Sequence, residues 1–226
     1  MTEVFTGAAR WQVDEWLTSF YPEDLPTEWQ MAYYANEFST TLIECQTYCD
    51  AVRLDDLSEM LEDCHDGFRP IFSINMDEDT PDQAGHFFHW LDKIDSDMGI
   101  HRLAGVLLSV DAQIDNQALL DWRQCIPQAL PVAFDGNVPF DTENRQWLAE
   151  MGISPVWRVD QPVISGQRYW LSNIPLTGDA PGLATRIRGF LGVISAETPA
   201  CVVATSGYEE VSRLQELSTI VRLING

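Results

Sequence analysis

The chain has 226 residues, 45% of them hydrophobic, which is enough material for a substantial core. Its 35 acidic residues outnumber its 13 basic ones, so the formal net charge is −22 at pH 7. Phosphate backbones and anionic lipid surfaces would repel such a chain, and we expect neither nucleic acid nor membrane as a partner.

Short apolar runs rich in β-branched and aromatic residues alternate with longer amphipathic segments along the chain. The runs predict strands over residues 3–8, 40–45, 70–75, 103–111, 131–135, 155–160, 168–173 and 200–206. The amphipathic segments predict helices over residues 27–38 and from Leu54, Asp82, Asn116, Thr142, Pro181 and Tyr208. The connection between the sixth and seventh runs is too short to hold a helix.

This alternation predicts an α/β fold of the (β/α)8 TIM-barrel type, compact with short loops. No linker, repeat or low-complexity segment divides the chain, so we expect one domain over residues 1–226. An open doubly wound sheet with a nucleotide site is less favoured, because residues 6–11 lack the G-x-G-x-x-G pattern after the first strand.

The region from residue 16 to residue 41 is dense in aromatic rings and contains two prolines. We expect a rigid loop and first helix packed against the barrel, because proline fixes φ and aromatic rings bury large areas. The positions that carry a resemblance are Gly7, Trp11, Trp16, Phe20, Tyr21, Pro22, Leu25, Pro26, Trp29, Tyr34, Ala35, Phe38 and Thr40. In identity and spacing they resemble the N-terminal signature of the YecE-like family, also called domain of unknown function 72.

Later segments resemble the same family in outline: residues 72–75 its third strand, residues 156–162 its sixth and residues 168–173 its seventh. The resemblance implies a TIM-type barrel. This chain departs from the family pattern at the positions of the family's pocket. Two hydroxyl residues and a glycine of the family are replaced after Gly7, and the carboxylate of the second strand moves two residues onward to Glu44. The usual lysine falls near Asn75, and the usual arginine and histidine fall near Leu171 and Asn173.

Functional residues of a (β/α)8 barrel lie at the carboxyl ends of its strands. The candidate catalytic residues there are Asp160, Glu44, Asp135 and Asp111. The candidate ligand-binding residues are Trp11, Asn75, Arg158 and Asn173. Asp160 ranks first because it also survives from the family pattern, although Arg158 lies on the same strand face and could neutralise it.

Two kinds of chemistry fit converging carboxylates, and one structural alternative remains. The carboxylates could hold a divalent cation such as Mg²⁺, or they could form an acid and base pair with separated pKa values. Alternatively, Asp and Asn at strand ends are ordinary turn formers and helix caps.

The remaining metal-ligand residue types predict no site. His86 and His89 are three apart, but their segment belongs to an outer helix. The five cysteines, an odd number without a regular framework, predict reduced thiols. The N-terminus lacks the features of a secretory signal, so we expect a cytoplasmic protein with no resident cofactor, Mg²⁺ remaining open.

Three functions stay open at this point. The first is binding, with a degenerate pocket and a small molecule, another protein or a second copy of the chain as partner. The second is a carboxylate-based hydrolase or isomerase, with or without Mg²⁺, acting on a small neutral or cationic substrate. The third is a ligand-stacking module that uses Trp11 and Trp170, which requires exposed rings.

Overall fold

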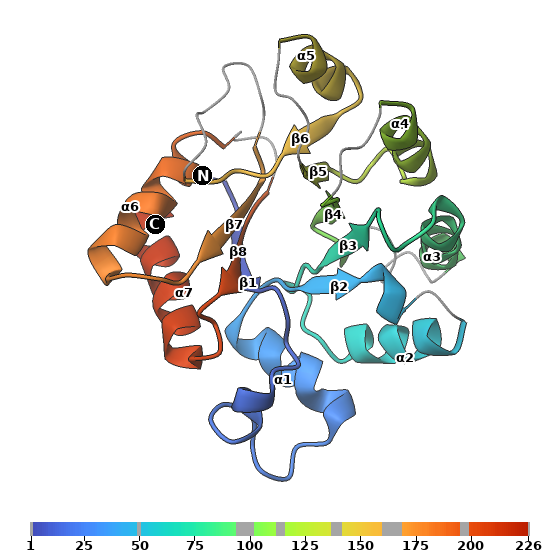
Figure 1. Ribbon diagram of the computed structural model, residues 1–226. Helices are drawn as coiled ribbons and strands as arrows, with labels where there is room; N and C mark the ends of the chain where they lie inside the picture. The colour runs from blue at the N-terminus through green and yellow to red at the C-terminus, as the bar shows by residue number, and fades with distance from the viewer. Residues whose placement is uncertain are drawn as a thin grey trace. The chain divides into compact units, whose positions relative to one another are not determined.

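The computed structural model describes residues 2–48, 51–93, 102–111, 116–136, 142–159, 169–194 and 199–225. Within these ranges eight strands alternate with seven α-helices, which confirms the predicted α/β class and the (β/α)8 order of elements (Figure 1). The strand pairs whose register is described are all parallel.

The strands are β1 Val4–Ala8, β2 Leu42–Glu44, β3 Ile71–Asn75, β4 Gly105–Ser109, β5 Val132–Asp135, β6 Ile153–Pro155, β7 Leu171–Pro175 and β8 Ala200–Ser206. The α-helices are α1 Gln30–Glu37, α2 Ala51–Glu62, α3 Pro81–Lys93, α4 Asn116–Cys125, α5 Thr142–Glu150, α6 Ala180–Leu191 and α7 Val211–Asn225. Three short 3-10 helices are η1 Asp14–Leu17, η2 Thr27–Trp29 and η3 Cys45–Thr47.

The sixth and seventh strands differ from the predicted bounds. β6 covers residues 153–155 instead of 155–160, and it pairs with β5 from Ile153 to Pro155. Proline has no backbone N–H to donate to a ladder, which fits the end of the strand there. β7 covers residues 171–175 instead of 168–173, and its register is set by pairing with β8.

The chain divides into two compact units. The first unit comprises Met1–Leu42, Met60–Arg69 and Val156–Gly226, and its sheet has the order β1-β8-β7. The second unit comprises Ile43–Glu59 and Pro70–Pro155, and the five-stranded sheet has the order β2-β3-β4-β5-β6. Within the described residues, no ladder that would close these strands into one barrel is detected. A single domain over residues 1–226 stays a prediction.

In the first unit, β8 is the central strand, and its residues from Ala200 to Ala204 are buried. α6 and α7 lie side by side next to this sheet (Figure 1), and α7 also contacts β1. A buried hydrogen bond of 2.8 Å joins the hydroxyl groups of Thr6 in β1 and Ser218 in α7. The first unit therefore brings the first strand, β1, together with the last strand, β8, and the last helix, α7.

The aromatic segment of the first unit, residues 16–41, packs against other parts of that unit and holds them in place. The indole of Trp16 is fully buried and stacks on Tyr34, with 5.9 Å between ring centroids. Its Nε1 donates to the carbonyl oxygens of Tyr208 and Glu209, each at 3.1 Å. The segment thus fixes the residues that precede α7.

Tyr34 connects the exit of β1 to the segment before β2. Its hydroxyl accepts a hydrogen bond from the Ala8 N–H and donates one to the Thr40 carbonyl, both at 2.8 Å. A Cβ at Gly7 would lie 1.7 Å from that Thr40 carbonyl oxygen, so only glycine allows the two backbones to approach this closely.

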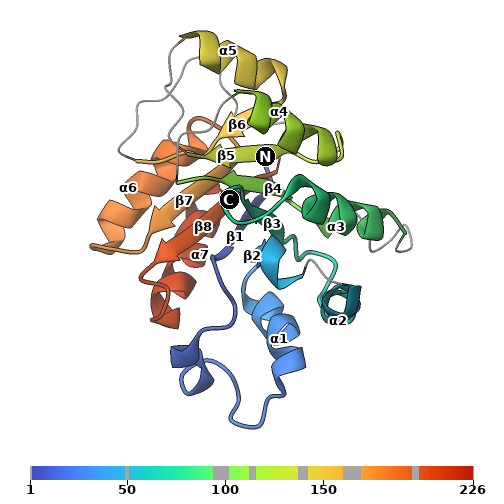
Figure 2. The ribbon, with the colours of Figure 1, turned by 45° about the vertical axis from the view of Figure 1, so that its right-hand side comes forward.

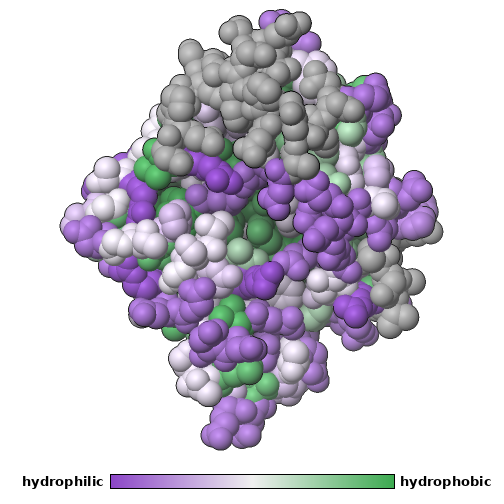
Figure 3. Space-filling model, viewed as in Figure 1, coloured by the Kyte–Doolittle hydropathy of each residue, from purple (hydrophilic) through white to green (hydrophobic). Residues whose placement is uncertain are grey.

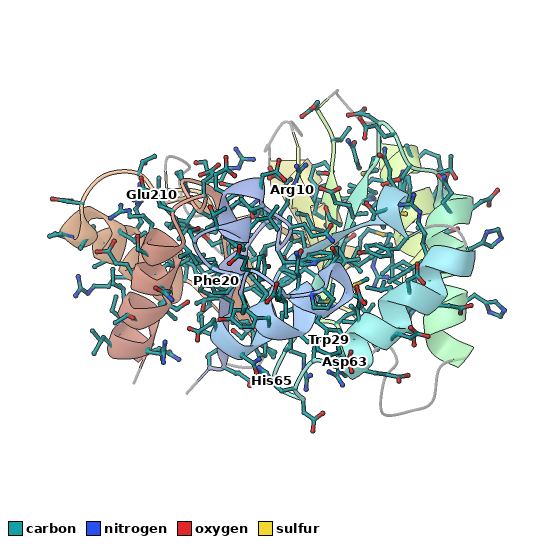
Figure 4. All side chains as sticks on the ribbon, turned by 90° about the horizontal axis from the view of Figure 1, so that it is seen from below. Arg10, Phe20, Trp29, Asp63, His65 and Glu210 are labelled. Atoms are coloured by element: carbon teal, nitrogen blue, oxygen red, sulfur yellow. The ribbon has the colours of Figure 1, made fainter. Side chains whose placement is uncertain are left out.

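The surface of the N-terminal segment is mostly hydrophilic with small apolar patches (Figure 3). Leu17 and Trp29 are the large apolar side chains exposed there, at 50% and 56%. In the view from below, Arg10 and Glu210, which follow β1 and β8, lie at one end of the first unit (Figure 4). Asp63 and His65 lie at the other end, where His65 hydrogen-bonds the Ala35 carbonyl at 2.7 Å.

In the second unit, β3, β4 and β5 pair in sequence order and bury most of their side chains. α3 lies beside α4 next to this sheet (Figure 2), and its Phe87 stacks on Phe72 of β3. No helix in the described part of the chain has the length and apolar character needed to cross a bilayer.

Candidate functional site

The second unit brings four of the predicted residues to one sheet edge. Asn75 pairs with Ser109 and Ser109 pairs with Asp135, so the last residues of β3, β4 and β5 form one row. Glu44 ends β2, the neighbour of β3, and Asp111 lies two residues beyond the end of β4. We call this the acidic edge: Glu44, Asn75, Asp111, Asp135 and the loop of residues 76–80 after β3.

Asn75 shapes the loop that follows it. Its side-chain Oδ1 accepts a hydrogen bond from the Asp77 N–H at 3.1 Å, and its carbonyl accepts from the N–H groups of Glu78 and Asp79. The Met76 N–H donates to the Ser109 carbonyl at 2.8 Å and joins the loop to β4. Asn75 therefore acts as a turn former here, as asparagine commonly does after strands.

The exposed carboxylates of the loop are held by neighbouring segments. Asp77 accepts a hydrogen bond from the backbone N–H of Asp111 at 2.8 Å, so Asp111 contributes its main chain to this contact. Glu78 accepts from the Gln46 amide at 2.5 Å. Figure 3, viewed as Figure 1, shows a hydrophilic surface over β3 and β4. These contacts give the edge a defined arrangement of negative groups.

Asp79 differs from its acidic neighbours because it is 7% exposed. Its Oδ2 accepts from the Asn75 N–H at 2.8 Å, whereas its buried Oδ1 accepts no conventional hydrogen bond. Burial raises the pKa of Asp79, and the charges of Glu78 and Glu44 raise it further, against the lowering effect of the Asn75 N–H and the Cys45 thiol. The fold thus holds a carboxyl group with a raised pKa beside the exposed carboxyl group of Glu44.

Sequence reasoning missed Asp79. One signal was present: residues 77–79 form an acidic run between the end of a strand and the proline that begins α3. A turn does not require three successive carboxylates.

The remaining predicted residues have different surroundings. Trp11 is buried in the first unit, and its carbonyl accepts a hydrogen bond from the Tyr21 hydroxyl. Asn173 is half-buried within β7 opposite Val203, and Arg158 is exposed. Asp160 lies outside the described residues, so its pairing with Arg158 stays a prediction.

Two alternatives raised by the sequence, a ligand-stacking module and a metal site, each depend on a structural condition. A ligand-stacking module needs exposed indoles, but Trp11 and Trp170 are 6% and 3% exposed, so that condition is not met. Among the described residues, no group of three or more His, Cys, Asp or Glu side chains is placed to hold a metal ion. His86 and His89 are exposed on α3.

No protein-family model matches the chain, and no curated protein matches it. Among solved structures, the chain is similar to an apo endo-beta-N-acetylglucosaminidase from Cordyceps militaris, with 12% sequence identity and a TM-score of 0.48. That alignment covers 100% of this chain and 92% of the other. A TM-score below 0.5 does not establish a common fold.

Proposed function

We propose that the protein is a divergent YecE-like protein that binds a small neutral or cationic molecule at the acidic edge. The observation that carries this proposal is the Asp79 carboxyl group, which is buried and has one oxygen without a conventional hydrogen bond. A buried oxygen in this state costs free energy, which a donor on a ligand would offset.

The charge of the edge selects the ligand class. The charges of Glu78 and Glu44 raise the pKa of Asp79, so both side chains add to the negative charge around it. Because the chain carries a net charge of −22, an anionic ligand would be repelled. A hydroxyl or ammonium group supplies a stronger donor to Asp79 than the Cys45 thiol does, and an ammonium group also gains from the surrounding charge.

The resemblance to the YecE-like family supports binding with a changed pocket. Gly7, Trp16 and Tyr34 match the family signature, and each has a definite packing or hydrogen-bonding role in this fold. The family's lysine, arginine and histidine positions hold other residue types here. Retention of the scaffold with loss of those groups favours a ligand of different chemistry.

The test is a binding screen by amide NMR with neutral polyols, monosaccharides, alkylamines and, as negative probes, small carboxylates and phosphate. Neutral or cationic probes should shift the amides of residues 76–80, and the anions should not. In the Glu44→Gln and Asp79→Asn variants, affinity should fall about tenfold or more, as expected for losing a hydrogen bond to a charged group.

The matched control is Glu59→Gln, which removes one negative charge from an exposed position of α2. Affinity should not change in this variant. If no neutral or cationic probe binds, or if all three variants bind alike, the proposal is wrong.

A second function, acid–base catalysis, is favoured by one specific observation. Asp79 has a raised pKa and lies beside the exposed carboxyl group of Glu44, and a carboxyl group with a raised pKa can serve as a general acid. Incubation with neutral glycosides and phosphoesters, with Mg²⁺ or with EDTA, tests it. Turnover that disappears in Asp79→Asn and persists in Glu59→Gln would support catalysis, and absence of turnover under both conditions would favour binding alone.

A further inference from the structure

A second concave site lies at the opposite edge of the five-stranded sheet, where β5 and β6 begin. It is a cleft of about 540 Å³ between the end of α4 and the turn from α5 to β6. Its lining consists of Arg123, Gln124, Ile126, Gln128, Glu150, Met151 and Gly152. None of these residues belongs to the acidic edge, so the cleft is independent of the function proposed above.

The guanidinium of Arg123 is fixed in this cleft by two backbone carbonyls. Its Nε donates to the Met151 carbonyl at 3.1 Å, and its Nη1 donates to the Ile126 carbonyl at 2.9 Å. Both carbonyls belong to residues directly after a helix, where main-chain acceptors lack intrahelical partners. The side chain is therefore held in one orientation before any ligand arrives.

Arg123 is a half-buried cation without a carboxylate partner among the described residues. Burial lowers its pKa, as expected for a cation that has lost water. A guanidinium has five N–H donors, and the two carbonyls leave the others available.

Glu150 lines the same cleft but does not pair with Arg123. Its Oε1 accepts from the amide of Gln146, one helical turn earlier, at 3.0 Å. The cleft thus presents a cation and an anion that are not joined to each other. We propose that it binds a small zwitterion of the amino-acid class, with the ligand carboxylate on Arg123 and the ligand ammonium on Glu150.

A zwitterion fits better than a singly charged ligand. A simple anion would meet Glu150, the net charge of the chain and the carboxyl ends of α4 and α5, where the helix dipole is negative. A simple cation would leave the remaining donors of Arg123 unused. The alternative is that Arg123 only caps the two helix ends, in which case the cleft binds nothing.

The experiment is an amide NMR titration of the full chain with glycine, β-alanine and 4-aminobutyrate, which space the two charges differently. Acetate and ethylammonium serve as singly charged probes. At least one zwitterion should shift the amides of Gln124, Gln128 and Gly152, and should bind more tightly than either singly charged probe. Equal or tighter binding of acetate or of ethylammonium, or no shift with any zwitterion, overturns the proposal.

Variants locate the two charges. Arg123→Gln should weaken zwitterion binding about tenfold or more, whereas Arg188→Gln, which removes the same charge from an exposed position of α6, should not. Glu150→Gln should weaken the zwitterion and strengthen acetate. If Arg123→Gln fails to fold, the Glu150→Gln result alone decides, because that variant keeps both hydrogen bonds of Arg123. Unchanged binding in Glu150→Gln overturns the proposal.

Discussion

Replacement of Tyr34 by phenylalanine should destabilise the protein far more than its small chemical change suggests. The ring would stay in place against Trp16, so Tyr34→Phe deletes only the hydroxyl. That hydroxyl is fully buried, and it is the partner of both the Ala8 N–H and the Thr40 carbonyl. Burial also raises the pKa of Tyr34, so the group stays protonated and can donate and accept at once.

The magnitude follows from the two backbone groups left behind. Ala8 and Thr40 are both 0% exposed, so water cannot replace the lost hydroxyl. An unsatisfied buried group costs about 1 to 3 kcal/mol, so we expect Tyr34→Phe to lower the free energy of unfolding by about 2 to 6 kcal/mol. Urea denaturation followed by tryptophan fluorescence and circular dichroism measures this difference.

Tyr33→Phe is the matched control for this prediction. Tyr33 precedes Tyr34 in α1, is partly exposed, and its hydroxyl forms no hydrogen bond within the described residues. We expect a change within about 0.5 kcal/mol for Tyr33→Phe. If the two variants lose equal stability, the hydroxyl of Tyr34 does not join the exit of β1 to residue 40 as described.

Three further predictions concern the pH dependence of Asp79, one glycine and one tryptophan. Because burial raises the pKa of Asp79 above the ordinary value of an aspartate, the folded protein holds this proton more tightly than the unfolded chain does. The stability that this group contributes therefore falls as the pH rises from the unfolded pKa through the folded pKa. The stability of Asp79→Asn relative to the parent chain should therefore increase with pH in urea titrations made at successive pH values; a constant difference would contradict the raised pKa. Gly207→Ala should lower the thermal unfolding temperature of the protein more than Gly178→Ala does. Both glycines have a positive φ, +76° and +84°, but only the added Cβ at Gly207 would meet a backbone atom, the Leu176 carbonyl oxygen at 2.9 Å. Trp16→Phe should lower the free energy of unfolding by about 2 to 4 kcal/mol, because the indole N–H hydrogen bonds and part of the ring volume are lost. Trp29→Phe, at a 56% exposed position, should change it by less than about 0.5 kcal/mol. Similar effects of the two substitutions would refute the role given to Trp16.

The elements that periodicity predicts best are the long apolar runs. β8 has the predicted bounds, residues 200–206, because seven small or β-branched residues in succession favour a strand and the first five are buried. The sixth run was placed too late because β6 ends at Pro155, and beyond it the buried Trp157 forms only an isolated parallel bridge to Ser172 of β7 within the described residues. Apolar character predicts burial, but it does not show where ladder pairing stops.

The edge where the carboxylates meet was predictable, but the residue with unusual chemistry was not. Parallel strands end at the same edge, so Glu44, Asn75 and Asp135 could be assigned to it from the sequence. Within the acidic run 77–79, however, only Asp79 turns inward, because its carboxylate binds the Asn75 N–H four residues earlier. That contact depends on the path of the loop, which three similar side chains in a row do not reveal.

The bonds from Thr6 to Ser218 and from Trp16 to Tyr208 have a consequence for biosynthesis. The hydrogen-bond partners of Thr6 and Trp16 are synthesised about two hundred residues later, because the sequence separations are 212 and 192. Strands β3 to β6 can pair on the emerging nascent chain, whereas the described ladder of β1 is with β8, residues 200–206, and cannot form until those residues have been translated. The rings of the aromatic segment can contact one another early, as Trp16 and Tyr34 do, but the bonds from Trp16 to residues 208 and 209 form only at the end of synthesis.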